Sequence, residues 1–523
     1  MVSPRKENVT MYYFLNDNMQ YSKSGIEQAE INRLRLFEQH QIPAKIVTRV
    51  FAMNLTDVLK DAAIDRQNFV NLFEFFCGSM QVPSKSFTIN DLSLPANTTT
   101  TRKDDQIQVF AQGKMLMIIY LRKGSEEISN IQYFEANGRT VSMAWWDVRG
   151  FKCLEQFFDW EGKISQEQYY GPDGQVHIEK NHYLNRTGQE GISWRVLNYN
   201  DSSWVFTGMN ELTRFFYDEL NRLDDHNVYI CDRTVECDWA LFHMQTDAFK
   251  VLHLHNDHVS DPSDMLHSPL NNNYTNALNN WHQWDAVISA TAEQSKDVVE
   301  RFGNDIPAFT IPVGYVTDKQ LLAKHQVFEK RQKGLVVHVA RLAPEKQQNH
   351  SIEAFAQVHQ KFPEARLELW GYANGDIEKQ FRQQVADAGL TDVVLFKGYT
   401  NDISSVYDRA QIGVLPSRAE GFSLTLLEAQ SHGVPMIAND VKYGPSDIIQ
   451  DGKSGILTED GQPQQLAAGM MELLGDRSLL ERYSEQAYEN AKRYSEDMVF
   501  EKWQELITYF AHLASERAAV ANN

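Results

Sequence analysis

The feature that most constrains this chain is a repeat of 12 residues in its first half. Residues 132–138, 144–150, 156–162 and 168–174 each place two adjacent aromatic residues four and five positions before a glycine. Aromatic residues favour strands, and Asn-Gly or Asp-Gly pairs favour tight hairpin turns. The repeat therefore predicts an antiparallel β-meander, which neighbouring strand-like segments extend to about residue 206.

The paired aromatic residues of the repeat have two interpretations. They could be a platform that stacks on sugars or nucleic-acid bases, or half-buried residues of the sheet, and the second use is the commoner one. Alternation along a strand sends neighbouring residues to opposite faces, so one of each pair is expected to face away from the main core. Such an apolar row is covered by a polymer, a second subunit or a nearby loop. We expect the meander to engage the acceptor or to self-associate.

The segments on both sides of the meander have the pattern of α/β domains. A strand at 11–15, a helix from Ile26 and a strand at 44–51 begin the chain. From about residue 334, short strands that are apolar throughout alternate with helices, which is typical of a parallel sheet buried on both faces. The sequence therefore predicts an α/β protein with two Rossmann-like domains and an antiparallel insertion in the N-terminal one.

The predicted boundaries follow these changes of pattern. The N-terminal Rossmann-like domain is predicted in two parts, 1–84 and 208–316, with the β insertion at 85–207 between them. The C-terminal Rossmann-like domain is predicted at 317–495, and a final helix at 496–523 returns to the N-terminal domain.

Composition and charge exclude several classes of protein. Fifty basic and 70 acidic side chains leave a net charge of −20, which argues against general binding of nucleic acid. The four cysteines show no zinc-ligand spacing, and so few in 523 residues fit a reducing compartment. The apolar run at 115–121 is far shorter than the roughly 20 residues that cross a bilayer. We expect a cytoplasmic protein, with peripheral contact at the inner face of the membrane left open.

Three familiar motifs are absent from the sequence. The DGKS segment at 451–454 resembles the end of a phosphate-binding loop, but Asp447 stands where that motif needs glycine. No G-x-G-x-x-G follows a strand, so nothing predicts a nicotinamide or flavin. There is also no D-x-D, the usual metal clamp of other nucleotide-sugar enzymes. The sequence predicts neither a metal nor a cofactor.

Charged residues follow two strands of the C-terminal domain, at the strand ends where open α/β sheets bind ligands. Arg341 and Lys346 share one loop, and Glu420 and Glu428 follow the strand at 412–417. The two cations can neutralise a pyrophosphate, and a carboxylate can accept two ribose hydroxyls. For either motif alone, ion pairs at the protein surface would be a better explanation than a nucleotide-binding site. Both motifs on consecutive loops favour a nucleoside diphosphate.

A helix after Glu420 would add a second way to hold phosphate. A helix that starts near Ser423 offers free backbone N–H groups and the positive end of its dipole. Gly421 lets the backbone approach a ligand closely.

These residues, with GYANGD at 371–376 and the loop that begins at Ser24, resemble the retaining GT-B glycosyltransferases of the glycogen synthase-like superfamily. The resemblance implies a UDP-sugar donor and no metal. It implies that the Arg–Lys pair holds the pyrophosphate, the first glutamate contacts the transferred sugar and the second binds ribose. The implied donor-binding residues are Ser24, Gly25, Arg341, Lys346, Glu420, Gly421, Phe422, Ser423, Leu424 and Glu428.

Three histidines, His253, His255 and His258, lie at the end of an apolar strand. They could bind a metal, but His253 and His255 share a face of the strand while His258 follows in the loop, and a core role is favoured for His253. The family places a histidine that contacts the donor sugar here, and His255 matches it best, with His258 as the alternative. The catalytic residues that the resemblance implies are thus His255, Arg341, Lys346 and Glu420.

The large insertion and KYGPSDII at 442–449 resemble the poly(glycerol-phosphate) α-glucosyltransferases of wall teichoic acid, and the adhesin glycosyltransferases of the accessory secretion system share this layout. We therefore expect transfer of an α-linked hexose, with glucose favoured, from a UDP-sugar to a cell-surface polymer. The alternatives are a Ser/Thr O-GlcNAc or O-Glc transferase that acts on an adhesin and, from another class, a non-catalytic glycan- or adhesin-binding subunit.

Overall fold

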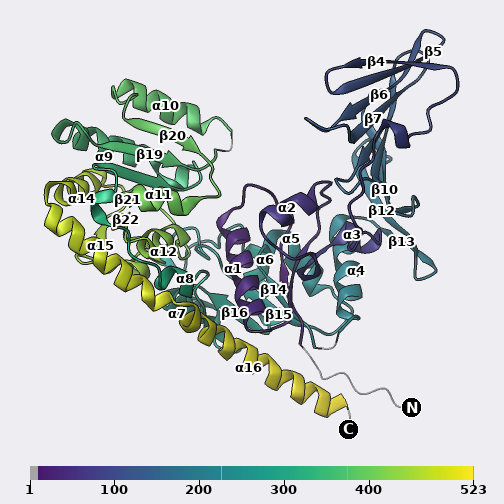
Figure 1. Ribbon diagram of the computed structural model, residues 1–523. Coiled ribbons are helices and arrows are strands. Elements are labelled where there is room, and N and C mark those ends of the chain that lie inside the picture. The colour runs from purple at the N-terminus through teal and green to yellow at the C-terminus, as the bar shows by residue number, and fades with distance from the viewer. Residues whose placement is uncertain (1–9, 225, 374, 522–523) are drawn as a thin grey trace. The chain divides into compact units, whose positions relative to one another are not determined.

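The chain divides into two compact units, which are described here separately. The computed structural model describes residues 10–224, 226–373 and 375–521. The first unit holds 10–23 and 42–248, and the second holds 24–41 and 249–521. Both contain parallel strands joined by helices, and the first also carries a large antiparallel sheet (Figure 1). The predicted α/β fold with an antiparallel insertion is confirmed, whereas the domain boundaries stay predictions.

The first unit contains a parallel sheet of short buried strands in the order β14-β1-β2-β3. Their bounds are Val228–Cys231, Tyr12–Leu15, Ala44–Thr48 and Phe69–Asn71. The α-helices of this unit are α2 (Leu55–Asp61), α3 (Leu72–Phe76), α4 (Met209–Asn221) and α5 (Thr234–Phe242).

The antiparallel sheet has ten strands that pair in chain order from β4 to β13. They are β4 (Thr98–Lys103), β5 (Gln106–Ala111), β6 (Lys114–Leu121), β7 (Ile128–Phe134), β8 (Thr140–Trp146), β9 (Lys152–Phe158), β10 (Ile164–Tyr170), β11 (Val176–Leu184), β12 (Glu190–Tyr199) and β13 (Ser202–Phe206). Each glycine of the repeat has a positive φ, between 76° and 85°, in the turn after its strand. Those turns explain the 12-residue period, and the predicted meander is confirmed.

The aromatic row that faces away from the main core is covered within the chain, as the alternative of a nearby loop predicted. The register places Trp145 and Tyr169 on either side of Leu154 on one face, whereas Trp146 belongs to the apolar cluster of the other face, so this pair divides between the two faces. None of the eight aromatic residues is exposed, however. Tyr169 packs on Phe73 at 4.6 Å between ring centroids, in the core of the first unit. On the other face, the segment 87–94 covers the apolar residues of β5 to β8, so a loop supplies the cover there.

The second unit contains three parallel strands in the order β17-β16-β15 and a six-stranded parallel sheet in the order β20-β19-β18-β21-β22-β23. The strands are β15 (Phe249–His253), β16 (Ala286–Ser289), β17 (Ala308–Thr310), β18 (Leu335–Val339), β19 (Arg366–Trp370), β20 (Val394–Gly398), β21 (Ile412–Leu415), β22 (Met436–Asn439) and β23 (Gly455–Thr458). Consecutive residues Val336 and Val337 belong to core clusters on opposite faces, so β18 is buried on both sides as predicted.

Helices cover both faces of the six-stranded sheet (Figure 1). The α-helices of the second unit are α1 (Gly25–Gln39), α6 (Thr275–Asn279), α7 (Ala292–Phe302), α8 (Asp318–Leu321), α9 (Gln348–Lys361), α10 (Ile377–Asp387), α11 (Ile403–Arg409), α12 (Leu424–Ser431), α13 (Pro445–Ile448), α14 (Pro463–Gly475), α15 (Arg477–Ala491) and α16 (Glu496–Ala521). In α16, Trp503 packs on Phe37 of α1 at 5.3 Å and Phe510 packs on Phe249 at 5.1 Å. Within the described residues, no helix is both long enough and apolar enough to span a membrane.

Candidate active site

The candidate site lies where the strand order of the six-stranded sheet reverses. The chain runs from β18 outward through β19 and β20, and then returns to the other side of β18 with β21. Loops from the carboxyl ends of two such neighbouring strands enclose a crevice, the usual ligand site of open parallel sheets. The loop after β18 carries Arg341 and Lys346, and the loop after β21 carries Glu420. Topology therefore brings both predicted motifs together.

Lys346 and Glu420 form an ion pair across this crevice. Lys346 Nζ donates to Glu420 Oε1 at 2.7 Å, and the glutamate side chain is only 8% exposed. A buried carboxylate without a cation would be costly, so each group supports the other's charge. This pair puts an ammonium group and a carboxylate at one point of the crevice, where they can contact a phosphate and a sugar hydroxyl.

Arg341 has a different environment from Lys346. Its guanidinium pairs with Glu345 in its own loop at 2.5 Å, and its side chain is 44% exposed. In this structure Arg341 therefore forms a surface ion pair, which was the alternative interpretation of the motif. Its predicted contact with a pyrophosphate requires the guanidinium to leave Glu345, and stays a prediction.

The start of α12 has the features of an anion site. Ser423, the residue before the helix, has φ 77°, which is strained for a residue with a side chain. Its buried hydroxyl has no hydrogen-bond partner among the described residues. Leu424 begins the helix, as predicted. Phe422 is buried against Tyr494 at 5.5 Å between ring centroids. Its side chain is therefore occupied in the core, and the predicted contact with the donor would be made by its backbone.

Glu428 lies on the second turn of α12 and is partly exposed. No hydrogen bond to its carboxylate is found within 10–224, 226–373 and 375–521. Burial raises the pKa of Glu428 to about 7. A carboxylate that is poorly solvated and unpaired can accept the hydroxyls of a ribose, as the resemblance implies.

Gly421 lies against the segment that follows β15. A Cβ atom on Gly421 would lie 2.3 Å from the carbonyl oxygen of His255 and 2.9 Å from Asn256 N. Backbone atoms cannot yield to such a contact, so glycine is required here for close packing. The packing brings the backbone of His255 against Gly421, the residue that follows Glu420 in the chain.

The segment 254–258, called here the 254–258 loop, is held by hydrogen bonds from its surroundings. His255 N donates to Tyr274 Oη at 2.9 Å, and the backbone oxygens of Asn256 and Asp257 accept from Gln294 Nε2 at 2.8 Å and Asn271 Nδ2 at 2.9 Å. Such anchors fix the directions of the side chains between them.

The three histidines of this region have different surroundings. His255 is half-buried, whereas His258 is fully buried, and both His258 ring nitrogens lack partners among the described residues. Burial lowers the pKa of His258 to about 4, so its ring is neutral at neutral pH. The interior position of His258 favours His255 as the histidine that contacts the sugar, and that assignment stays a prediction.

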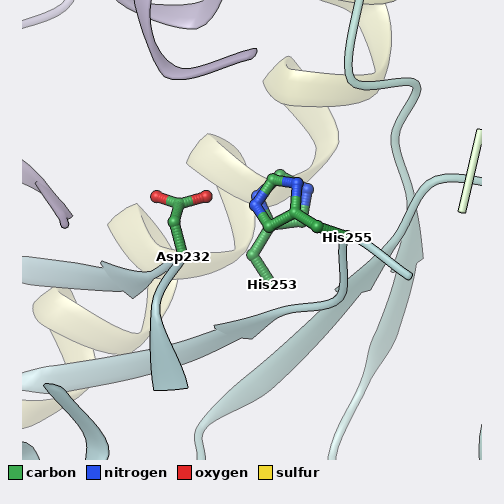
Figure 2. A group of neighbouring side chains, drawn as sticks. All are labelled: Asp232, His253 and His255. Atoms are coloured by element: carbon green, nitrogen blue, oxygen red, sulfur yellow. The ribbon is translucent and has the colours of Figure 1, made fainter. Parts of the chain in front are cut away.

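His253 and His255 lie side by side at the end of β15 (Figure 2), with ring centroids 4.1 Å apart. His253 is buried as expected, and its Nδ1 accepts a hydrogen bond from Arg33 Nη1 at 2.9 Å. The positive charge of Arg33 beside this nitrogen opposes the binding of a metal cation to the pair.

Asp257, in the same loop, is a candidate residue that sequence reasoning missed. It is 6% exposed, and burial together with the negative charge of Glu420 raises its pKa to about 7. The positive charges of Lys346 and Lys442 lower the pKa of Asp257, but by less. The only sequence signal was its place between His255 and His258 at a strand end, and its proximity to Glu420 is a product of the fold.

The KYGPSDII segment is tied to helix α7. Lys442 Nζ lies 2.7 Å from Asp297 Oδ2, and Tyr443 Oη donates to the same oxygen at 2.8 Å. Gly444 has φ 102°, and a Cβ atom there would lie 2.3 Å from the carbonyl oxygen of Phe422. The segment therefore links α7 to the loop that leads into α12.

The remaining predicted residues lie at two other loops of the second unit. Ser24 caps α1, and its backbone N–H donates to Glu27 Oε2 at 2.7 Å, while a Cβ atom on Gly25 would meet no atom within 4 Å. Gly371 of GYANGD has φ 140°, and a Cβ there would lie 2.0 Å from Ala340 O, so glycine is needed beside the Arg341 loop. Asn374 of the same motif lies outside the described residues. The donor-binding roles of Ser24 and Gly25 stay predictions.

The C-terminal part of the chain matches a known family. Residues 321–490 match the family model described as glycosyl transferases group 1. This range contains both charged motifs and α12.

The whole chain is similar to named glycosyltransferases. It is 25% identical over 516 residues to the "UDP-N-acetylglucosamine--peptide N-acetylglucosaminyltransferase GtfA subunit" of Streptococcus gordonii, which covers 95% of this chain and 98% of that protein. It is 22% identical over 523 residues to the "Poly(glycerol-phosphate) alpha-glucosyltransferase" of Bacillus subtilis, and this match covers 97% of this chain and 76% of that protein. Its fold resembles the crystal structure of the pneumococcal O-GlcNAc transferase GtfA with UDP and GlcNAc (TM-score 0.83, 22% identity, 97% of this chain and 100% of that one).

Proposed function

We propose that this chain, whose residues 321–490 match the family model of glycosyl transferases group 1, transfers an α-linked hexose, with glucose favoured, from a UDP-sugar to a cell-surface polymer with retention of configuration. The observation that carries this proposal is the Lys346–Glu420 pair at the reversal of strand order, beside the strained start of α12. Cation, carboxylate and free helix end are the groups that a sugar diphosphate requires.

In the proposed reaction, the acceptor hydroxyl attacks C1 of the sugar from the side of the leaving phosphate. The C1–O bond to UDP breaks as the new bond forms, and the leaving phosphate takes the proton of the acceptor. Lys346 stabilises the charge that grows on that phosphate, and Arg341 assists after it leaves Glu345. Glu420 contacts the sugar, and Glu428 accepts hydroxyls of the ribose.

We propose poly(glycerol-phosphate) wall teichoic acid as the acceptor. Similarity along the chain to the Bacillus subtilis enzyme supports it. Similarity to the Streptococcus gordonii protein supports the second candidate, a Ser/Thr O-GlcNAc or O-Glc transferase for an adhesin. Radiolabelled UDP-glucose and UDP-GlcNAc, each offered with teichoic acid and with a Ser/Thr-rich peptide, separate the two. Label in the polymer from UDP-glucose supports the first, and label in the peptide alone overturns it.

We further propose that the β insertion engages the polymer or a partner subunit. Large apolar side chains are exposed near its β11–β13 end, among them Tyr183, Leu184 and Val205 at 49%, 68% and 67%. In solution we expect a cytoplasmic enzyme that reaches membrane-linked acceptors peripherally. A non-catalytic subunit is disfavoured because Arg341, Lys346, Glu420 and Glu428 are all present.

A further inference from the structure

Asp257 is a buried carboxyl group in the loop that packs on Gly421, and the mechanism above assigns it no part. It follows β15, and only 6% of its surface is exposed. Across the described part of the chain, no donor reaches its carboxylate. Its oxygens are also not among the polar atoms that are fully sealed from solvent, so the carboxylate borders accessible space. A buried acid that is neither paired nor sealed is suited to a ligand that donates hydrogen bonds.

The backbone around Asp257 holds this carboxyl group in place. Its own carbonyl accepts from Asn271 Nδ2 at 2.9 Å, and the preceding carbonyl accepts from Gln294, which is fully buried. The same loop packs directly on the backbone of Gly421. Asp257 therefore has a fixed place beside the loop that carries Glu420, whose negative charge is close enough to raise the pKa of Asp257.

The chemistry of the neighbours indicates the kind of ligand. Lys346 is already paired with Glu420, and Lys442 with Asp297, so neither cation is committed to Asp257. A second anion would be repelled by two carboxylates at this point. Neutral hydroxyl groups, which donate to a carboxylate and add no charge, fit the position, and a hexose presents several of them.

We propose that Asp257 accepts a hydrogen bond from a hydroxyl of the transferred hexose, and that it fixes and selects the sugar together with Glu420. This inference rests on the proposed function. Asp257 thereby becomes a residue that determines sugar specificity.

The test combines Asp257→Ala and Asp257→Asn with UDP-glucose analogues that each lack one hydroxyl, at C3, C4 or C6. Asp264→Asn, which removes an exposed carboxylate seven residues later, is the matched control. Calorimetry gives Kd for UDP and for each UDP-sugar. We expect both Asp257 variants to bind UDP within about twofold of the wild type and UDP-glucose at least tenfold more weakly.

The decisive readout is the coupling between the side chain and one hydroxyl. One analogue should bind the wild type at least tenfold more weakly than UDP-glucose does, yet bind Asp257→Ala as well as UDP-glucose binds that variant. Equal loss of UDP and UDP-glucose affinity, or the absence of such a coupled hydroxyl, would overturn the proposal. A wild-type protein that binds no UDP-sugar would instead refute the proposed function itself.

Discussion

The ammonium group of Lys346 is 2.7 Å from Glu420, and in the proposed mechanism it contacts the leaving phosphate. Its removal takes away a cation from developing phosphate charge, an effect typically worth about 3–4 kcal/mol. We predict that Lys346→Ala lowers kcat by at least about 100-fold and changes KM less, because the charge appears in the transition state. Steady-state kinetics measures this, with Lys379→Ala as a control on an exposed lysine of the same unit. Near-wild-type turnover would remove Lys346 from the mechanism.

Glu428 should make stability depend on pH. Burial raises its pKa in the folded state to about 7 from 4.5, so the folded state binds the proton more tightly. The contribution of the protonated Glu428 side chain to the free energy of unfolding is fully present below pH 4.5, and it is lost as the pH rises through 7. Glu428→Gln should therefore be more stable than the wild type at pH 8, by about 1–2 kcal/mol, and similar at pH 5. Urea unfolding at both values measures this, and an equal difference at both would contradict it.

At the scale of elements, the contact between the 254–258 loop and the start of α12 depends on a glycine. We predict that Gly421→Ala lowers kcat/KM for the UDP-sugar at least about tenfold, because a Cβ atom 2.3 Å from the His255 carbonyl forces the two loops apart. Gly475→Ala, where the nearest atom would lie 3.7 Å away, is the matched control and should be active. Wild-type kinetics for Gly421→Ala would show that this contact does not position the site.

The sequence predicted those elements whose residues carry a local signal. Apolar runs located β18 and β21, the glycine period located β7 to β10, and α12 begins one residue after the predicted Ser423. What it could not predict depends on contacts between distant segments. The pairing of Arg341 with Glu345, the burial of His258 and the position of Asp257 beside Glu420 are of this kind. Strand alternation predicted that the second face of the meander needs a cover and left a nearby loop as one alternative, but it could not identify segment 87–94 as that cover.

At the scale of the whole molecule, the β insertion cannot simply be cut out to test its role. Arg149 of the insertion donates to Glu74 at 2.8 Å, and Tyr169 packs on Phe73, so excision would uncover the core of the first unit. Surface changes are the better test. We predict that the triple variant Tyr183→Ser, Leu184→Ser and Val205→Ser retains UDP-sugar hydrolysis but loses at least about tenfold in polymer glycosylation. Full activity on the polymer, with unchanged mass by light scattering, would reject the insertion as a binding surface.

The absence of a D-x-D motif and the Arg33 charge beside His253 lead us to expect catalysis without a metal. Activity in EDTA should equal activity in its absence. A loss of activity that Mn²⁺ restores would show that a metal takes part.

The central claim is that the crevice between β18 and β21 transfers a hexose from a UDP-sugar. The most direct measurement is UDP release from UDP-glucose and UDP-GlcNAc, with and without teichoic acid or the Ser/Thr-rich peptide. The account predicts acceptor-dependent UDP release from at least one of these donors, and its loss in Lys346→Ala. Binding of a UDP-sugar by calorimetry, with no UDP release under any of these conditions, would contradict it and indicate a non-catalytic subunit.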